Sequence, residues 1–198
     1  MTRLEAIVLA GGAGARFGGG KLTAPWRGGA LIDGALTAAL AAPVRSVTVV
    51  TGADMGVEAA ARAMAERLGQ SGRLRIVHCP EHAEGMGATL RTGVAALPPD
   101  AAGVYVFLGD MPLIPPAILP LLADAVAGGA PAAAPVFEGQ RGHPVLFSAA
   151  LLPELAKSKG DEGARQVLRG LGDRLALPES KDRGVLVDID RPGDIDAM

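Results

Sequence analysis

The feature that most constrains the fold is the stretch 6–21, in which an apolar run ends in a glycine-rich loop. Residues 7–10 are apolar, and glycine occupies positions 11, 12, 14, 18, 19 and 20 before Lys21. This pattern is typical of a buried central strand that ends in a tight turn. Glycine lets the loop backbone adopt positive φ and present its N–H groups to a ligand. With Arg16 and Lys21 present, the loop is predicted to bind a polyanion, most simply the phosphates of a nucleotide.

The loop matches neither of two better-known phosphate-binding motifs. The dinucleotide fingerprint requires glycine where this chain has Phe17, and an acidic residue where the second strand ends at Gly52. A Walker A motif requires Ser or Thr after its Gly-Lys pair, but Leu22 follows Lys21. A surface loop with solvated charges is the alternative to a phosphate site.

Bulk properties exclude several classes of protein. The 198 residues are enough for one domain with a sizeable core. A net charge of −2 without a basic run argues against nucleic acid as the main partner. The single cysteine, Cys79, excludes an internal disulfide and suits a reducing compartment. Because no apolar run approaches the ~20 residues of a membrane span, we expect a cytoplasmic protein that does not act at a membrane.

Apolar or β-branched runs alternate with helical patterns along the first two thirds of the chain. The expected strands are 4–10, 44–51, 74–78 and 104–108, and the expected helices are 31–42, 53–68, 86–97 and 115–127. Such alternation predicts an α/β fold, a three-layer α/β/α sandwich of Rossmann-like type with a mostly parallel sheet. Right-handed crossovers and the common strand order 3-2-1-4 place the fourth strand beside the first. Asp110, just past the fourth strand, is therefore expected next to the glycine loop.

The second half of the chain does not continue this alternation of strands and helices. We expect strands at 132–138, 142–147, 174–177 and 185–189, and helices at 149–157 and 162–170. The first two strands are predicted to form a small β-hairpin around Gly139, Gln140 and Arg141. Since no linker interrupts the chain, we expect a single domain over 1–198. Its nucleotide-binding half would be about 1–130 and its acceptor-binding half about 131–198.

Three carboxylates are candidate metal ligands. Asp110 follows a buried strand, although an aspartate there can also cap the next helix. Asp188 and Asp190 lie two apart on an expected strand, so both would point to one face and repel each other unless a cation lies between them. An exposed edge strand is the alternative for this pair. If the pair faces Asp110, the oxygen ligands suit Mg²⁺.

Other chemically notable residues have plainer interpretations. His78, Cys79 and His82 lack the fourth ligand and the spacing of a zinc site. Trp26 and Met86 fit packing better than cofactor contacts. His143, which precedes a proline in the expected hairpin, fits a substrate contact and a turn residue equally well.

The stretch LAGGAGARFGGGKL resembles the signature of the nucleotidyltransferase family that attaches a nucleotide to molybdopterin. Five further segments are similar in order and spacing: EGMGATLRTGV (84–94), LGDMPLI (108–114), RGHPVLF (141–147), GDEGARQVL (160–168) and VDIDRPGD (187–194). Together they span nearly the whole chain. The first motif also fits sugar- and alcohol-phosphate nucleotidyltransferases, whereas RGHPVLF with GDEGAR is more specific. Within the family, the chain looks most like the molybdenum cofactor cytidylyltransferases.

The resemblance implies a nucleotidyltransferase fold and a role for each matched segment. Residues implied to bind the nucleotide are Leu9, Ala10, Gly11, Gly12, Gly14, Gly85, Gly87 and Thr89, with Arg16 and Lys21 on the triphosphate. Residues implied in catalysis are Lys21, Arg16 and Asp110, with Mg²⁺ held by Asp110 and by Asp188 or Asp190. Residues implied on the acceptor side are Arg141, Gly142 and His143.

The implied reaction is transfer of CMP from CTP to the phosphate of molybdopterin, with release of pyrophosphate. A molybdenum hydroxylase would receive the product. Positioning and charge neutralisation carry such a transfer, and an ionised acceptor phosphate needs no general base. Three alternatives remain: a guanylyltransferase on the same acceptor, a sugar- or alcohol-phosphate nucleotidyltransferase, and a non-catalytic carrier of the cofactor. Lys21 and Asp110 argue against the carrier, which needs no metal-bound triphosphate.

One departure from the cytidylyl pattern concerns the base. Cytidylyl members tend to read Leu-Ala-Ala-Gly where this chain has Leu9-Ala10-Gly11-Gly12, the form typical of guanylyl members. We take Gly12 as the position that replaces the alanine and expect Gly12→Ala to sharpen a preference for CTP. The later motifs favour cytidine.

Overall fold

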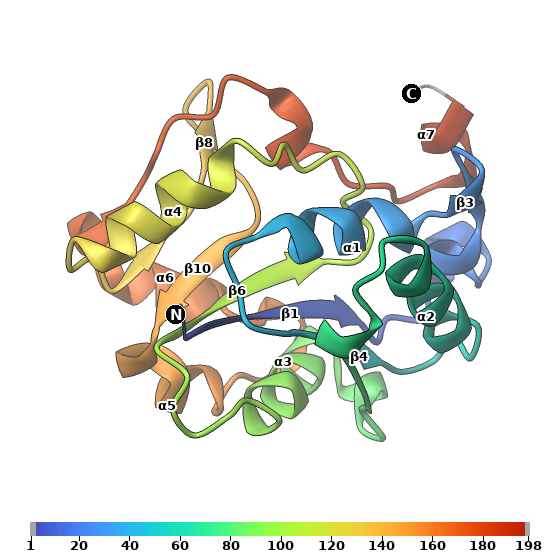
Figure 1. Ribbon diagram of the computed structural model, residues 1–198, viewed down its shortest axis with the longest axis horizontal. Helices are drawn as coiled ribbons and strands as arrows, with labels where there is room; N and C mark the ends of the chain where they lie inside the picture. The colour runs from blue at the N-terminus through green and yellow to red at the C-terminus, as the bar shows by residue number, and fades with distance from the viewer. Residues whose placement is uncertain (1–2, 197–198) are drawn as a thin grey trace.

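The computed structural model describes residues 3–196, arranged around one seven-stranded sheet (Figure 1). Its strands, in spatial order, are β11 (Leu175–Ala176), β7 (Ala132–Ala133), β10 (Val145–Ser148), β6 (Gly103–Leu108), β1 (Leu4–Ala10), β4 (Val47–Thr51) and β5 (Leu74–His78). β1 pairs in parallel with both β4 and β6, and β4 with β5. β10 runs antiparallel to β6 and β7. The predicted mostly parallel sheet and its 3-2-1-4 order are confirmed.

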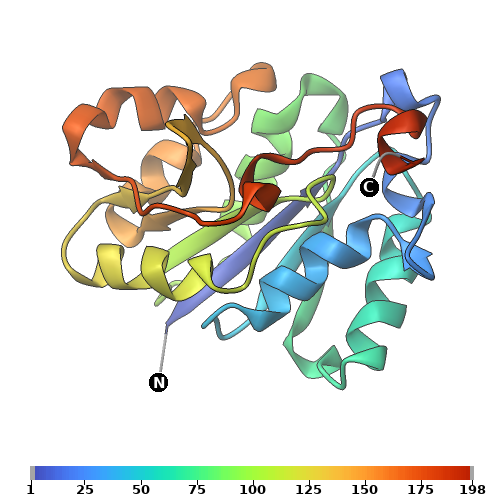
Figure 2. The ribbon, with the colours of Figure 1, turned by 90° about the horizontal axis from the view of Figure 1, so that it is seen from above.

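Helices cover both faces of the sheet, as Figure 2 shows from above. α1 (Ile32–Ala41), α2 (Val57–Arg67) and α4 (Ile118–Ala127) lie on one face, and α3 (Met86–Ala95), α5 (Leu152–Leu155) and α6 (Arg165–Leu171) on the other. The central strand β1 shows why. Ala6 and Val8 pack in the cluster that contains α1, α2 and α4, whereas Ile7 and Leu9 pack in the cluster that contains α3, α5 and α6. Alternate side chains point to opposite faces, so a wholly apolar strand needs a helical layer on each.

Short elements complete the chain. Two small antiparallel pairs are formed by β2 (Pro25–Trp26) with β3 (Gly29–Ala30) and by β8 (Val136–Phe137) with β9 (Gln140–Arg141). The 3₁₀ helices are η1 (Ala15–Phe17), η2 (Lys21–Thr23), η3 (Ser71–Arg73), η4 (His82–Glu84), η5 (Ala149–Leu151), η6 (Gly160–Glu162), η7 (Gly172–Arg174) and η8 (Arg183–Leu186). The described chain ends in α7 (Pro192–Asp196). Within residues 3–196, the structure contains no helix long and apolar enough to cross a membrane.

The predicted hairpin is present, but its strands are interrupted and its turn lies earlier. The first expected strand divides into β7 and β8, the second corresponds to β10 alone, and β9 lies where the turn was expected. Glu138 (φ 50°) and Gly139 (φ 78°) make the turn. Positive φ at both central residues defines the two-residue turn that matches strand twist. Gln140 and Arg141 therefore belong to β9 and not to the turn.

The strand predicted over 185–189 is wrong. Residues 183–186 form η8, where the Asp182 side chain accepts a hydrogen bond from the Gly184 amide at 2.7 Å. The chain then runs extended outside the sheet, and the Ile189 amide donates to the Asp110 carbonyl at 3.0 Å. The apolar run is thus explained by burial, since Val185 packs in the main hydrophobic core and Ile189 is 1% exposed. This segment crosses the carboxyl ends of the parallel strands.

A buried carboxylate stabilises the opposite end of β1. Glu5 is 1% exposed and accepts hydrogen bonds from Arg45 Nε at 2.6 Å, Ser46 Oγ at 2.5 Å and the Ser46 amide at 3.1 Å. A buried charge is tolerated when hydrogen bonds of this kind replace its hydration. The cluster joins β1 to the segment that precedes β4.

We expect Ser46→Ala to lower the free energy of unfolding by about 2 kcal/mol, because one hydrogen bond to a buried charge is lost. Urea denaturation of both proteins measures this change. Ser71→Ala, at an exposed position, is the control and should stay within about 0.5 kcal/mol of wild type. Equal midpoints for Ser46→Ala and wild type would contradict the role given to this hydroxyl.

Candidate active site

The glycine loop after β1 folds back on itself. Gly14, Gly18, Gly19 and Gly20 have φ between 60° and 93°, a region that other residues rarely adopt. These turns bring Lys21 against Gly14, where an added Cβ would lie 3.0 Å from the Lys21 Cβ. The glycines therefore position the lysine as well as exposing backbone.

Lys21 pairs with Asp110 across the boundary between β1 and β6. Its Nζ lies 2.6 Å from Asp110 Oδ2, and the two side chains are 13% and 25% exposed. Asp110 is placed by β6, since the Gly109 amide donates to the Leu9 carbonyl at 3.0 Å. The predicted proximity of Asp110 to the loop is confirmed. The helix-cap alternative is wrong, because α4 begins at Ile118 with no side-chain cap.

The C-terminal segment brings two further carboxylates to this pair. Asp190 Oδ1 lies 3.7 Å from Lys21 Nζ, and Asp190 Oδ2 lies 3.1 Å from Arg16 Nη1. Burial raises the pKa of Asp188 above its usual range, and the nearby carboxylates of Asp110 and Asp190 add to this shift. The edge-strand alternative for Asp188 and Asp190 is wrong, since neither lies in a strand.

This charge cluster bears on metal binding. Among the described residues, no three His, Cys, Asp or Glu side chains are grouped closely enough to hold an ion by themselves. Lys21 instead lies between Asp110 and Asp190. Oxygen donors crowded by like charge still suit Mg²⁺, which takes one or two carboxylates and completes its shell with phosphate and water.

A cavity of about 520 Å³ adjoins Lys21 and Asp110. Residues that line it and that the sequence had suggested for the nucleotide are Leu9, Ala10, Gly11, Gly12, Gly14, Lys21, Gly85 and Thr89. Gly87 is not among the lining residues; it packs against the backbone of Lys159. Arg16 also lies outside the lining and is 77% exposed. Lining residues that sequence reasoning missed include Leu22, His82, Ala83, Met86, Leu108 and Asp161.

The interpretation of the Leu9–Gly12 motif needs a correction. Compared position by position with Leu-Ala-Ala-Gly, the chain differs at the third residue, Gly11, and not at Gly12. A Cβ added to Gly12 would meet no heavy atom within 4 Å, whereas one added to Gly11 would lie 2.5 Å from Thr89 Oγ1. The Thr89 side chain thus occupies the space that an alanine methyl would take.

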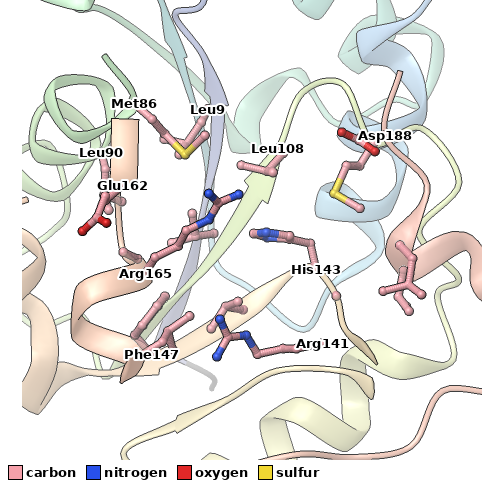
Figure 3. A pocket seen from close by; sticks show the side chains of 18 of the residues that line it. Leu9, Met86, Leu90, Leu108, Arg141, His143, Phe147, Glu162, Arg165 and Asp188 are labelled. Atoms are coloured by element: carbon pink, nitrogen blue, oxygen red, sulfur yellow. The ribbon is translucent and has the colours of Figure 1, made fainter. Parts of the chain in front are cut away.

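A second cavity of about 410 Å³ lies on the other side of Leu9 and Leu108 (Figure 3). The predicted acceptor residues Arg141, Gly142 and His143 line it, as does Asp188. Figure 3 shows Arg165 and His143 pointing into its centre, with Glu162 and Asp188 on opposite sides. Sequence reasoning missed Arg165 and Glu162 although both lie in a quoted motif. Met86, interpreted as packing, lines both cavities.

His143 is held at the back of this second cavity. Its amide donates to the Val185 carbonyl at 2.9 Å, and its Nδ1 is buried without a partner among residues 3–196. Burial lowers the pKa of His143 to about 4, so the imidazole is neutral at pH 7. Such a ring offers a hydrogen bond to a ligand without adding charge.

A glycine loop beyond a parallel sheet, a lysine opposite an aspartate and two adjoining cavities fit a nucleotidyltransferase, an enzyme that transfers a nucleotide to a second substrate. Residues 6–177 match the model of the MobA-like NTP transferase domain, and the chain belongs to that family.

Two curated relatives match nearly their whole length. The chain is 30% identical to the molybdenum cofactor cytidylyltransferase of Escherichia coli K12, covering 98% of this chain and 94% of the relative. It is 31% identical to the purine catabolism protein PucB of Bacillus subtilis 168, covering 98% and 95%. The first of these relatives agrees with the molybdopterin resemblance in the sequence.

Solved structures show the same fold. Rv0371c from Mycobacterium tuberculosis H37Rv superimposes with a TM-score of 0.78 at 25% identity, covering 99% of this chain and 97% of that one. A structure of Rv0371c described as a complex with manganese has a TM-score of 0.69 at 25% identity, covering 90% and 89%.

Proposed function

We propose that this protein transfers CMP from CTP to the terminal phosphate of molybdopterin and releases pyrophosphate. The observation that carries the proposal is the Lys21–Asp110 pair, which lines the first cavity and lies near Asp188 on the wall of the second. A nucleotide in the first cavity and a phosphate-bearing acceptor in the second would meet beside this pair. The similarity to a molybdenum cofactor cytidylyltransferase supports both substrates.

The transfer reaction depends on positioning of the substrates and neutralisation of their charge. An oxygen of the acceptor phosphate attacks the α-phosphorus, and the bond from that phosphorus to the pyrophosphate breaks. Lys21 neutralises charge on the leaving group, while exposed Arg16 closes over the outer phosphates. Arg141 and Arg165 hold the acceptor, and neutral His143 offers it a hydrogen bond. No side chain needs to remove a proton.

We propose Mg²⁺ as the cofactor, held by Asp110 with Asp190 or Asp188. A divalent cation neutralises phosphate charge and orients the reacting oxygens when bound. Asp110 and Asp190, which both lie near Lys21 Nζ, and the neighbouring Asp188 offer oxygen donors for a cation whose shell phosphate and water complete. The manganese complex of a related structure is in line with a divalent metal. A molybdenum hydroxylase remains the proposed recipient of the product.

The division of labour between the halves also remains a proposal. Residues of about 1–130 supply most of the nucleotide cavity, and residues of about 131–198 supply Arg141, His143 and Arg165 to the acceptor cavity. We also propose that 1–198 is a single domain, because strands from both halves belong to one sheet. Asp161 departs from this division, because it lines the nucleotide cavity.

A direct assay tests the proposed reaction. Pure protein with Mg²⁺, molybdopterin and one of CTP, GTP, UTP or ATP should release pyrophosphate fastest with CTP. A sugar or alcohol phosphate in place of molybdopterin should give no release above background. Turnover only with such acceptors, or no turnover with any nucleotide, would contradict the proposal.

A guanylyltransferase is the second candidate, because Gly11 is the form typical of guanylyl members. Thr89 weighs against it. Its side chain fills the space beside Gly11, so the glycine gives no extra room for a purine. We therefore propose CTP over GTP.

We expect Thr89→Ala to raise kcat/KM for GTP relative to CTP by roughly tenfold, because a pocket that discriminates by size supplies ~1–3 kcal/mol. Competition between CTP and GTP measures the ratio. Thr92→Ala, one turn further along α3 and outside both cavities, is the control and should leave the ratio unchanged. A wild-type preference for GTP would overturn the cytidylyl assignment.

A further inference from the structure

A carboxylate from the second half of the chain reaches the nucleotide cavity. Asp161 in η6 lines it together with His82, Gly85 and Thr89. A Cβ added to Gly85 would collide with Asp161 Oδ1, so the carboxylate lies directly against the residue that precedes α3. Among the residues that the structure describes, this carboxylate has no hydrogen-bond donor and no ion-pair partner. It is free to accept a hydrogen bond from a bound molecule.

Packing fixes the position of the loop that carries this carboxylate. The loop that carries it begins at Ser158, whose carbonyl accepts a hydrogen bond from Arg91 Nη1 at 2.8 Å. A Cβ on Gly87 would lie 2.6 Å from the Lys159 carbonyl carbon, and one on Gly163 would lie 3.0 Å from Met86 Sδ. Backbone contacts this close hold the loop on the first turn of α3.

The lining of the cavity indicates which part of a nucleotide Asp161 faces. Four ionisable side chains in the described part of the chain line it: Lys21, His82, Asp110 and Asp161. Lys21 and Asp110 are paired with each other and lie near Asp188 on the wall of the acceptor cavity, which is the side where the proposed function places the α-phosphate. The base therefore extends toward the wall made by residues 82–89, on which Asp161 lies.

We propose that Asp161 reads the base by accepting a hydrogen bond from its exocyclic amino group. A carboxylate accepts from the amino group of cytosine, whereas uracil presents a carbonyl oxygen at the same position. Two acceptors facing each other, one of them charged, leave both without a donor. Asp161 thus selects a base that carries an amino group. Guanine also offers N–H donors, so this inference rests on nucleotide binding in the proposed function but not on the choice of CTP over GTP.

The comparison of CTP with UTP tests this inference, because the two bases have the same size. Calorimetric titration with Mg²⁺ and without acceptor measures binding without turnover. Wild type should bind CTP roughly 10- to 100-fold more tightly than UTP, the worth of one hydrogen bond to a charged group. Asp161→Asn keeps the shape of the side chain and adds an N–H donor. It should therefore weaken binding of CTP, strengthen binding of UTP and bring the two dissociation constants within about threefold of each other.

Two further variants keep the test specific. Asp161→Ala should weaken binding of CTP but strengthen binding of UTP less than Asp161→Asn does, because alanine offers no hydrogen-bond donor. Asp173→Asn, an exposed aspartate outside both cavities, should leave the ratio at its wild-type value. Thermal unfolding should be alike in all variants, because residue 161 is exposed on a loop.

The outcomes separate this inference from the proposed function. A CTP-to-UTP ratio unchanged in Asp161→Asn, or close to one in wild type, overturns the inference while CTP can remain the substrate. Tighter binding of GTP than CTP overturns the cytidylyl assignment. If GTP binding then weakens in Asp161→Asn, the base-reading role of Asp161 stands.

Discussion

Lys21→Ala is expected to lower kcat for pyrophosphate release by roughly 10²-fold or more, the usual effect of removing one charge-stabilising donor. The ammonium group lies 2.6 Å from Asp110 Oδ2, and the lysine side chain is only 13% exposed. It is therefore pre-positioned where charge develops on the leaving pyrophosphate. Steady-state assays with CTP, Mg²⁺ and molybdopterin measure the change.

The matched control for this substitution is Lys181→Ala. Lys181 is exposed and lines neither cavity, so its loss should leave kcat within twofold of wild type. Circular dichroism should show both variants folded. Normal turnover by folded Lys21→Ala would contradict a catalytic role for Lys21.

Asp110→Asn is expected to raise the Mg²⁺ concentration for half-maximal activity by at least about tenfold, since the amide keeps the shape but loses the charge that attracts a cation. It should also lower kcat at saturating Mg²⁺ by roughly 10²-fold. Asp110 is placed for this by β6 and lies beside Asp190 and Asp188. A titration of activity against Mg²⁺ decides the point. An unchanged curve would leave Asp110 only as the partner of Lys21.

The sequence predicted the part of the fold that periodicity governs. Strands β1, β4, β5 and β6 begin and end within about three residues of their expected positions. Helix ends were less accurate where local hydrogen bonds intervene. α2 begins at Val57 and not at residue 53, because Asp54 accepts a hydrogen bond from the Gly56 amide at 2.9 Å. Strand order then followed from connection rules, and it placed Asp110 beside the loop.

The segment over 185–189 shows what sequence patterns could not predict. Val185 joins the main hydrophobic core and Ile189 is also buried, although neither lies in a strand, and burial of this kind has the same sequence pattern as a short strand. Likewise, nothing local to residues 160–165 shows that Asp161 lies against Gly85. Such contacts depend on close backbone packing between segments far apart in the chain. Glycines in the matched motifs, such as Gly85 and Gly87, are the signal that could have indicated these close approaches, because a Cβ at either position would collide with the 159–161 loop.

The loop at 160–163 has a consequence for how this family diversifies. One peptide bond separates Asp161, on the wall of one cavity, from Glu162, on the wall of the other. A single-residue deletion between Gly160 and Gly163 would move both carboxylates at once. Under the proposed function, in which one cavity holds the nucleotide and the other the acceptor, one change in this loop would alter both substrate sites together.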